Sequence, residues 1–174
     1  MSKKVTIRRV GADEAPACIE RLADVLIDSV EGGASVSFML PMPREKAVSF
    51  WRGVADGVAR GERTLLVAED DEGEIVGTVQ MVTAMPENQP HRADIAKLLV
   101  HRRARRAGVG QLLMATVEDA AREQGKSVLV LDTASADAER LYERLGWTRV
   151  GEVPQYALLP DGKLSGTTFF YKHV

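Results

Sequence analysis

The turn Arg105-Arg106-Ala107-Gly108-Val109-Gly110 lies between two stretches of different character. An apolar, strand-like run at 95–100 precedes it, and a long amphipathic helix is expected after it, over 108–124. Two glycines let the backbone turn tightly and approach a ligand closely. The first turn of a helix presents unpaired N–H groups and the positive end of the helix dipole. The turn therefore predicts an anion site, most naturally for a phosphate or pyrophosphate.

Hydrophobic periodicity extends this strand, turn and helix into a mixed α/β fold. Apolar residues at every third or fourth position predict helices over 15–30, 44–60, 108–124 and 137–145. Strands are predicted over 4–10, 64–69, 74–83, 93–100, 127–132, 147–159 and 167–172. The order is β-α-α-β-β-β-α-β-α-β-β, with an antiparallel hairpin around 70–73 and a parallel crossover between 93–100 and 127–132. The run 127–132 is almost continuously apolar, which is typical of a strand buried on both faces.

Composition narrows the function classes. The chain has 174 residues, 45% of them hydrophobic, and a formal net charge of -2, so we expect one domain over residues 1–174 and no nucleic-acid partner. The single cysteine, Cys18, excludes an internal disulfide and suits the cytoplasm. No apolar run has membrane-spanning length, and the three histidines lack metal-ligand spacing, so we expect neither a membrane partner nor a metal. The oligomeric state is left open, and a homodimer is one option.

A second motif, Ala138-Glu139-Arg140-Leu141-Tyr142-Glu143-Arg144-Leu145-Gly146-Trp147, follows the turn after one helix and one strand. Together the two motifs resemble the GNAT superfamily of acyl-CoA-dependent N-acyltransferases, and the resemblance in element order covers nearly the whole chain. It implies a GNAT fold, acetyl-CoA as cofactor, a pyrophosphate cradled by the turn, and a tyrosine near the thioester sulfur. The implied cofactor contacts are Leu98, Leu99, Val100, Arg105, Arg106, Ala107, Gly108, Val109, Gly110, Gln111, Ser135 and Tyr142.

Several segments also look like the tabtoxin-resistance acetyltransferases, which detoxify a β-lactam amino-acid toxin by acetylating its amine. These segments are 31–39, 92–94, 131–133, 148–154, 160–164 and 169–172. The narrower resemblance implies toxin resistance and a small amine as acceptor. Gly32, Gly33, Ser35 and Phe38 are the residues expected to line the acceptor side. The alternative for them is a turn that ends a helix, followed by one buried aromatic ring.

The chemistry requires an unprotonated amine, although an alkyl amine in water has a pKa of roughly 10. A carboxylate can take the proton directly or through water. Asp94 and Asp132 lie on the two strands that flank the crossover helix, so both are candidates for the base. The alternatives are a strand-edge charge for Asp94 and a turn cap for Asp132. Tyr142 is the expected general acid, with core packing as its alternative.

These residues predict direct acetyl transfer from acetyl-CoA to a small amine, without an acyl-enzyme. The thioester oxygen is expected to accept a hydrogen bond from strand backbone near Leu99 or Val100. An alternative within the same fold is acetylation of a protein N-terminus or lysine. A more distant one is a module that binds acyl-CoA or nucleic acid without catalysis through Arg102, Arg103, Arg105 and Arg106.

Overall fold

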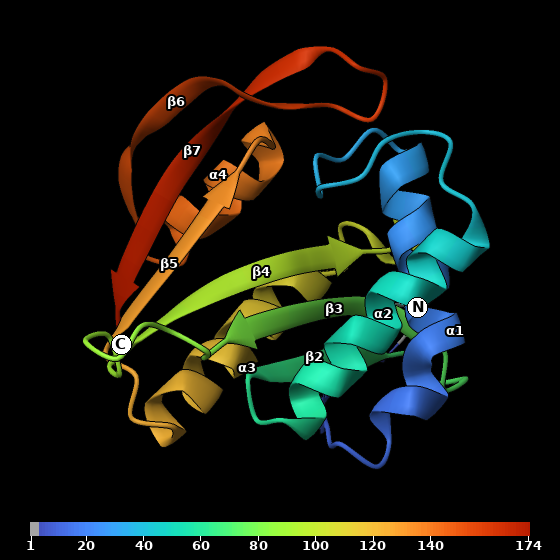
Figure 1. Cartoon of the computed structure of the whole chain (residues 1–174), viewed down its shortest axis with the longest axis horizontal. Coiled ribbons are helices and arrows are strands. Elements are labelled where there is room, and N and C mark those ends of the chain that lie inside the picture. Colours follow the sequence, from blue (N-terminus) through green and yellow to red (C-terminus); the bar gives the residue numbers. More distant parts are fainter. Residues whose placement is uncertain (1–3) are drawn as a thin grey trace.

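The computed structural model describes residues 4–174 and contains a seven-stranded sheet (Figure 1). The strands are β1 (Thr6–Val10), β2 (Arg63–Glu69), β3 (Ile75–Val82), β4 (Arg92–Val100), β5 (Val128–Thr133), β6 (Thr148–Leu158) and β7 (Leu164–His173). They lie in the order β1-β2-β3-β4-β5-β7-β6. Among these strands β4 and β5 run parallel, and the other neighbours are antiparallel. The predicted hairpin, crossover and element order are confirmed.

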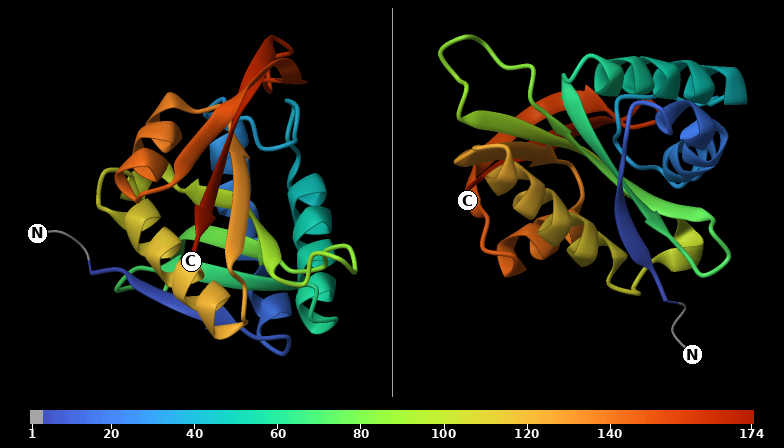
Figure 2. Two further views of the ribbon diagram at one scale, coloured as in Figure 1. Left: turned by 90° about the vertical axis from the view of Figure 1, so that its left-hand side faces the viewer. Right: turned by 90° about the horizontal axis from the view of Figure 1, so that it is seen from below.

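Helices cover both faces of the sheet (Figure 2). They are α1 (Ala15–Glu31), α2 (Arg44–Ala59), α3 (Val109–Glu123) and α4 (Ala136–Arg144), with the short 3-10 helix η1 (Arg102–Ala104) before α3. α1 and α2 pack on one face, and α3 and α4 pack on the other. None of the helices in the described part of the chain has the length and apolar character needed to cross a membrane.

Strand β2 explains why two separate cores form. Successive side chains of a strand point to opposite faces. Leu65 and Val67 accordingly pack with α1 and α2, whereas Leu66 and Ala68 pack with α3. All four are buried. The sheet is therefore rigidly held from both sides, and its strand ends can position a site.

Strand β5 corrects one expectation. Leu129 and Leu131 are buried, but Val128 and Val130 are half-buried and Asp132 is exposed. The prediction of a strand buried on both faces is therefore wrong. The apolar sequence of β5 does not reveal this difference, because Val128 and Val130 are as apolar as the buried Leu129 and Leu131 although their face is only partly covered.

Strand β7 begins earlier than predicted, at Leu164 instead of Thr167. Ser165 and Gly166 have little strand propensity, but β7 pairs with β6 from Leu158↔Leu164 onward. Pairing with β6 therefore determines where β7 begins, because the context of a strand can override the β propensity of its residues.

Candidate active site

Strands β4 and β5 separate after a short paired stretch. Their parallel pairing is confined to 92–94 against 128–130, and beyond Asp94↔Val130 the two strands are no longer paired (Figure 1). The part of β4 from Ile95 to Val100 therefore has a free backbone edge toward β5. Leu98, Leu99 and Val100, which are expected to contact the cofactor, lie on this stretch. This free edge can form backbone hydrogen bonds with an extended ligand.

The predicted anion site, residues 105–110, is called the anion turn and lies next to this stretch. Its first glycine has the geometry that the sequence predicts. Gly108 has φ 75°, in the left-handed region, and is the N-terminal cap of α3. Arg106 also has positive φ, at 61°. The backbone N–H groups of residues 106–111 donate to no acceptor in the described part of the chain. A run of free amides at a helix N-terminus fits the diphosphate of a nucleotide-like cofactor.

Gly110 has a different role from Gly108. It lies inside α3 and lacks a positive φ. A Cβ added there would come within 3.3 Å of Leu141 Cδ2 on α4. This second glycine therefore allows α3 and α4 to approach each other, and the turn itself depends on Gly108.

The four arginines at positions 102, 103, 105 and 106 differ in the contacts that they make with the rest of the protein. Arg105 Nε donates to Val100 O (3.3 Å), and Arg103 Nη2 donates to Ile75 O (3.3 Å). Arg102 pairs with Asp28. The Arg106 guanidinium makes no hydrogen bond or ion pair with residues 4–174. Arg106 is thus the arginine left free to meet an anionic ligand.

Asp28 is a residue that the sequence analysis missed. It is a buried carboxylate near the end of α1, and it accepts a hydrogen bond from the Arg102 backbone N–H (2.9 Å) and from the Arg102 guanidinium. His101 Nε2 lies 3.7 Å from it. Burial lowers the pKa of His101, and the opposing charge of Asp28 does not reverse this, so the imidazole is neutral at pH 7. A charged residue within the apolar face of a predicted helix was the available signal.

Tyr142 lies on α4 with its ring inside the core. Its side chain packs against Trp147 and Phe170, with ring centroids 5.9 Å and 5.7 Å apart, and only 5% of the residue is exposed. Burial, and to a lesser extent the charge of Asp132, raises the pKa of the Tyr142 hydroxyl. The phenol therefore keeps its proton at physiological pH and can act as a donor. The ring therefore packs in the core as the alternative predicts, and the role of the hydroxyl as general acid stays a prediction.

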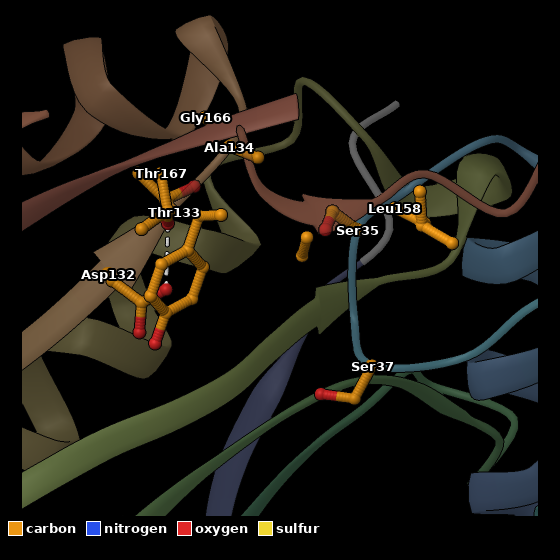
Figure 3. A pocket seen from close by; sticks show the side chains of 10 residues that line it. Ser35, Ser37, Asp132, Thr133, Ala134, Leu158, Gly166 and Thr167 are labelled. Atoms are coloured by element: carbon orange, nitrogen blue, oxygen red, sulfur yellow. Dashed lines mark hydrogen bonds between the residues drawn. The ribbon is translucent and has the colours of Figure 1, made fainter. Parts of the chain in front are cut away.

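The two candidate bases have different surroundings. Asp132 lines a cavity of about 110 Å³, and its Oδ2 accepts a hydrogen bond from Thr167 Oγ1 (2.7 Å; Figure 3). Asp94 forms an ion pair with Arg92, and it is not among the cavity-lining residues. Both strands bury their alternate residues toward α3, so both carboxylates emerge on the opposite face of the sheet. Of the two candidate bases, the structure thus places Asp132 on the lining of the cavity and Asp94 outside it.

Of the four residues expected on the acceptor side, Ser35 lines this cavity (Figure 3). Gly32 lies against the anion turn, since a Cβ on it would come within 3.7 Å of Arg105 Nη2. Gly33, with φ 88°, follows directly and is not a lining residue. Phe38 packs edge-on against Phe50 of α2, with centroids 5.2 Å apart. The chain leaving α1 passes the anion turn first and reaches the cavity only at Ser35.

Three further polar residues border the site. Ser135 caps α4, because its Oγ accepts the Ala138 N–H (3.2 Å), and its own N–H donates to Thr133 Oγ1 (3.1 Å). Lys97 and Ser37 were missed by the sequence analysis, and Lys97 Nζ lies 3.1 Å from Ser37 Oγ. Ser37 is a lining residue of the cavity. A lysine within the apolar run 95–100 was the signal for Lys97.

A family model described as the acetyltransferase (GNAT) family matches residues 34–147. The chain belongs to the GNAT acetyltransferase family. An uncharacterized N-acetyltransferase of the hisH-hisA intergenic region in Azospirillum brasilense is 32% identical over 130 residues, which cover 74% of each chain. The matched segment of the GNAT model includes both the anion turn and the Tyr142 motif.

Solved structures agree on the GNAT fold. The yncA protein of Salmonella typhimurium, solved with its cofactor acetyl-CoA, has a TM-score of 0.77 at 20% identity and covers 98% of this chain and 94% of its own. A ribosomal-protein-alanine N-acetyltransferase from Brucella melitensis has a TM-score of 0.76 at 24% identity, with 97% and 99% covered. At such identities the likeness shows the fold alone. With the family match, acetyl-CoA is the acyl donor, and the chain is an acetyl-CoA-dependent acetyltransferase of GNAT type.

Proposed function

We propose that this enzyme transfers the acetyl group of acetyl-CoA directly to the amine of a small molecule. The observation that carries the proposal is the arrangement at the separated ends of β4 and β5. The anion turn follows the end of β4, and Asp132, near the end of β5, lines the cavity. A cofactor bound through its diphosphate at residues 106–111 can thus lie along β4 toward an acceptor beside Asp132.

Different residues carry out the different steps of the acetyl transfer. When bound, acetyl-CoA supplies a thioester, whose acetyl carbon gains a bond to the amine nitrogen as its bond to sulfur breaks. Asp132 takes the proton that leaves the nitrogen, directly or through one water. Tyr142 donates a proton toward the sulfur, and its raised pKa ensures that this proton is present. The backbone edge of β4 near Leu99 and Val100 holds the thioester oxygen.

The acceptor class can be tested with a panel. Coenzyme A release from acetyl-CoA is measured with amino acids, polyamines, aminoglycosides and short peptides, and a β-lactam amino acid is included because of the resemblance to tabtoxin-resistance enzymes. Turnover with small amines and none with peptides is expected. Turnover confined to peptides would replace the small-molecule acceptor with a protein acceptor. Acetyl-CoA binding without any turnover would favour a binding module.

Substituting Asp132 with asparagine is expected to lower kcat/KM about 100-fold at pH 7, because the amine then loses its proton without help. Asparagine keeps the size of the side chain and can still accept the Thr167 hydrogen bond. The deficit should shrink as the pH rises toward the pKa of the amine, roughly 10, where the acceptor deprotonates by itself. The measurement is a pH profile of kcat/KM from pH 6 upward.

Asp94→Asn is the matched control for Asp132→Asn, since it removes the other carboxylate of the same face. We expect a clearly smaller loss, because Asp94 is paired with Arg92 and lies outside the cavity lining. A larger loss in Asp94→Asn than in Asp132→Asn would assign the base to Asp94.

Asp28→Ala is expected to weaken acetyl-CoA binding about tenfold, because the buried carboxylate holds the Arg102 backbone at the start of the anion turn. Calorimetric titration with acetyl-CoA measures this. Asp24→Ala is the control, since Asp24 lies one turn earlier on α1 in an exposed pair with Arg44, and such pairs contribute little. Equal affinities of both variants would show that Asp28 does not position the turn.

A further inference from the structure

Lys97 interrupts the regular geometry of β4. Between Ala96↔Gln80 and Leu99↔Thr78, β4 has two residues where β3 has one, which defines a β-bulge. Lys97 sits in the bulge with φ 54°, a left-handed conformation that is uncommon for a residue with a side chain. A bulge changes the direction in which a side chain points, and bulges occur often beside active sites. Lys97 thus combines an uncommon backbone conformation with a charged side chain, and it does so in the middle of an apolar strand.

The redirected side chain ends beside the cavity. Lys97 Nζ lies 3.1 Å from Ser37 Oγ, and the ammonium lies 6.0 Å from the centroid of the Phe50 ring. Ser37 lines the cavity that Asp132 also lines (Figure 3). Lys97 itself is half-buried. Within residues 4–174 no carboxylate is close enough to form an ion pair with it.

Groups of opposite charge therefore lie near this cavity, because Asp132 is one of its lining residues and Lys97 contacts the lining residue Ser37 without lining the cavity itself. Asp132 on β5 is negative, and Lys97 on β4 is positive. Burial lowers the pKa of the Lys97 ammonium, the charge of Asp132 raises it, and that of Arg63 lowers it. Burying a charge is costly unless a group of opposite charge meets it. The protein supplies Lys97 with a hydroxyl and the face of an aromatic ring, but with no anion.

We propose that Lys97, assisted by Ser37, binds a carboxylate of the acceptor, so that this enzyme acetylates amines that also carry a carboxylate. The inference rests on the proposed acetyl transfer to a small amine. The acceptor lies with its amine toward Asp132 and its carboxylate toward Lys97. An amine without the carboxylate leaves the half-buried ammonium without a counter-charge, and this sets the preference between acceptors.

The first test compares each acceptor acid with its own carboxamide. Each amino acid acetylated in the panel is assayed beside its amide, and the amine groups are matched by comparing rates at pH values that give equal fractions of free amine. A hydrogen bond to a charged group predicts a preference for the acid of about 10- to 100-fold in kcat/KM. Lys97→Gln should remove this preference by lowering the rate on the acid while leaving the rate on the amide.

Lys46→Gln is the control for loss of a nearby positive charge. Lys46 is exposed on α2 and lies 5.8 Å from the Phe38 ring centroid, outside the cavity lining. The Lys46→Gln variant should keep the full preference for the acid over the amide. Equal rates on acid and amide in the unaltered enzyme would overturn the proposal, as would an equal loss on both in Lys97→Gln. In either case acetyl transfer to amines would still stand.

The second test needs no turnover. The lysine side-chain NMR spectrum of the coenzyme A-loaded protein is recorded during titration with sodium propionate and, separately, with sodium chloride at the same ionic strength. The Lys97 resonance, identified by its loss in Lys97→Gln, should shift with propionate and not with chloride, while Lys46 stays unmoved. Absence of a shift specific to propionate would overturn carboxylate binding whether or not an acceptor has been found.

Discussion

Gly108→Val is expected to weaken acetyl-CoA binding at least about 100-fold, or about 2.7 kcal/mol. Gly108 has φ 75°, and a β-branched residue is strongly disfavoured in this left-handed region. The backbone can relieve the strain only by rotating, which turns the amides of residues 106–111 away from their common direction. Beyond the two adjacent residues, no protein atom lies within 4 Å of an added Cβ, so backbone strain and not a clash causes the expected loss. Calorimetric titration with acetyl-CoA gives the affinity.

Gly125→Val separates this effect from a general loss of stability. Gly125 follows the other end of α3, has φ 70°, and likewise has no atom within 4 Å of an added Cβ. Both substitutions should lower the free energy of unfolding by similar amounts, about 1–2 kcal/mol. Only Gly108→Val should lose acetyl-CoA. Full affinity in a folded Gly108→Val protein would remove the anion turn from the cofactor site.

Tyr142→Phe is expected to lower kcat about 100- to 1000-fold with little change in acetyl-CoA affinity, because the phenol proton is lost while the ring remains. Phenylalanine keeps the packing against Trp147 and Phe170. Because burial raises the Tyr142 pKa, the hydroxyl stays protonated below pH 10, and the loss should not vary with pH in that range. Steady-state kinetics between pH 6 and pH 9 and a binding titration measure both quantities.

Tyr171→Phe is the corresponding control on β7, where the Tyr171 ring contacts His173. It removes a phenol from the neighbourhood of the same sheet and should leave kcat within about twofold, as expected for a substitution away from buried or reacting groups. If Tyr142→Phe is as active as Tyr171→Phe across the pH range, Tyr142 has a packing role and no part in proton transfer.

The sequence determined those features that depend on neighbours along the chain. Periods of two and 3.6 residues fix strands and helices locally, so the order of the elements was predictable. The anion turn is equally local, because a strand, a positive-φ glycine and a helix N-terminus lie within a few residues at Gly108. Tyr142 could be placed on a helix by the same means. The resemblance that joined these two motifs then indicated the family.

The tertiary structure alone decided which side chains meet. Arg102 contacts Asp28 across 74 residues, and Lys97 contacts Ser37 across 60. The apolar sequence of β5 is the same whether its second face is covered or open, and the packing of distant segments decides between the two. Asp132 lines a cavity because residues of β6, of β7 and of the chain at Ser35 and Ser37 meet it there, whereas Asp94 pairs with Arg92. Periodicity records which face of an element is buried, but contacts between distant segments depend on strand pairing and packing, which no local pattern specifies.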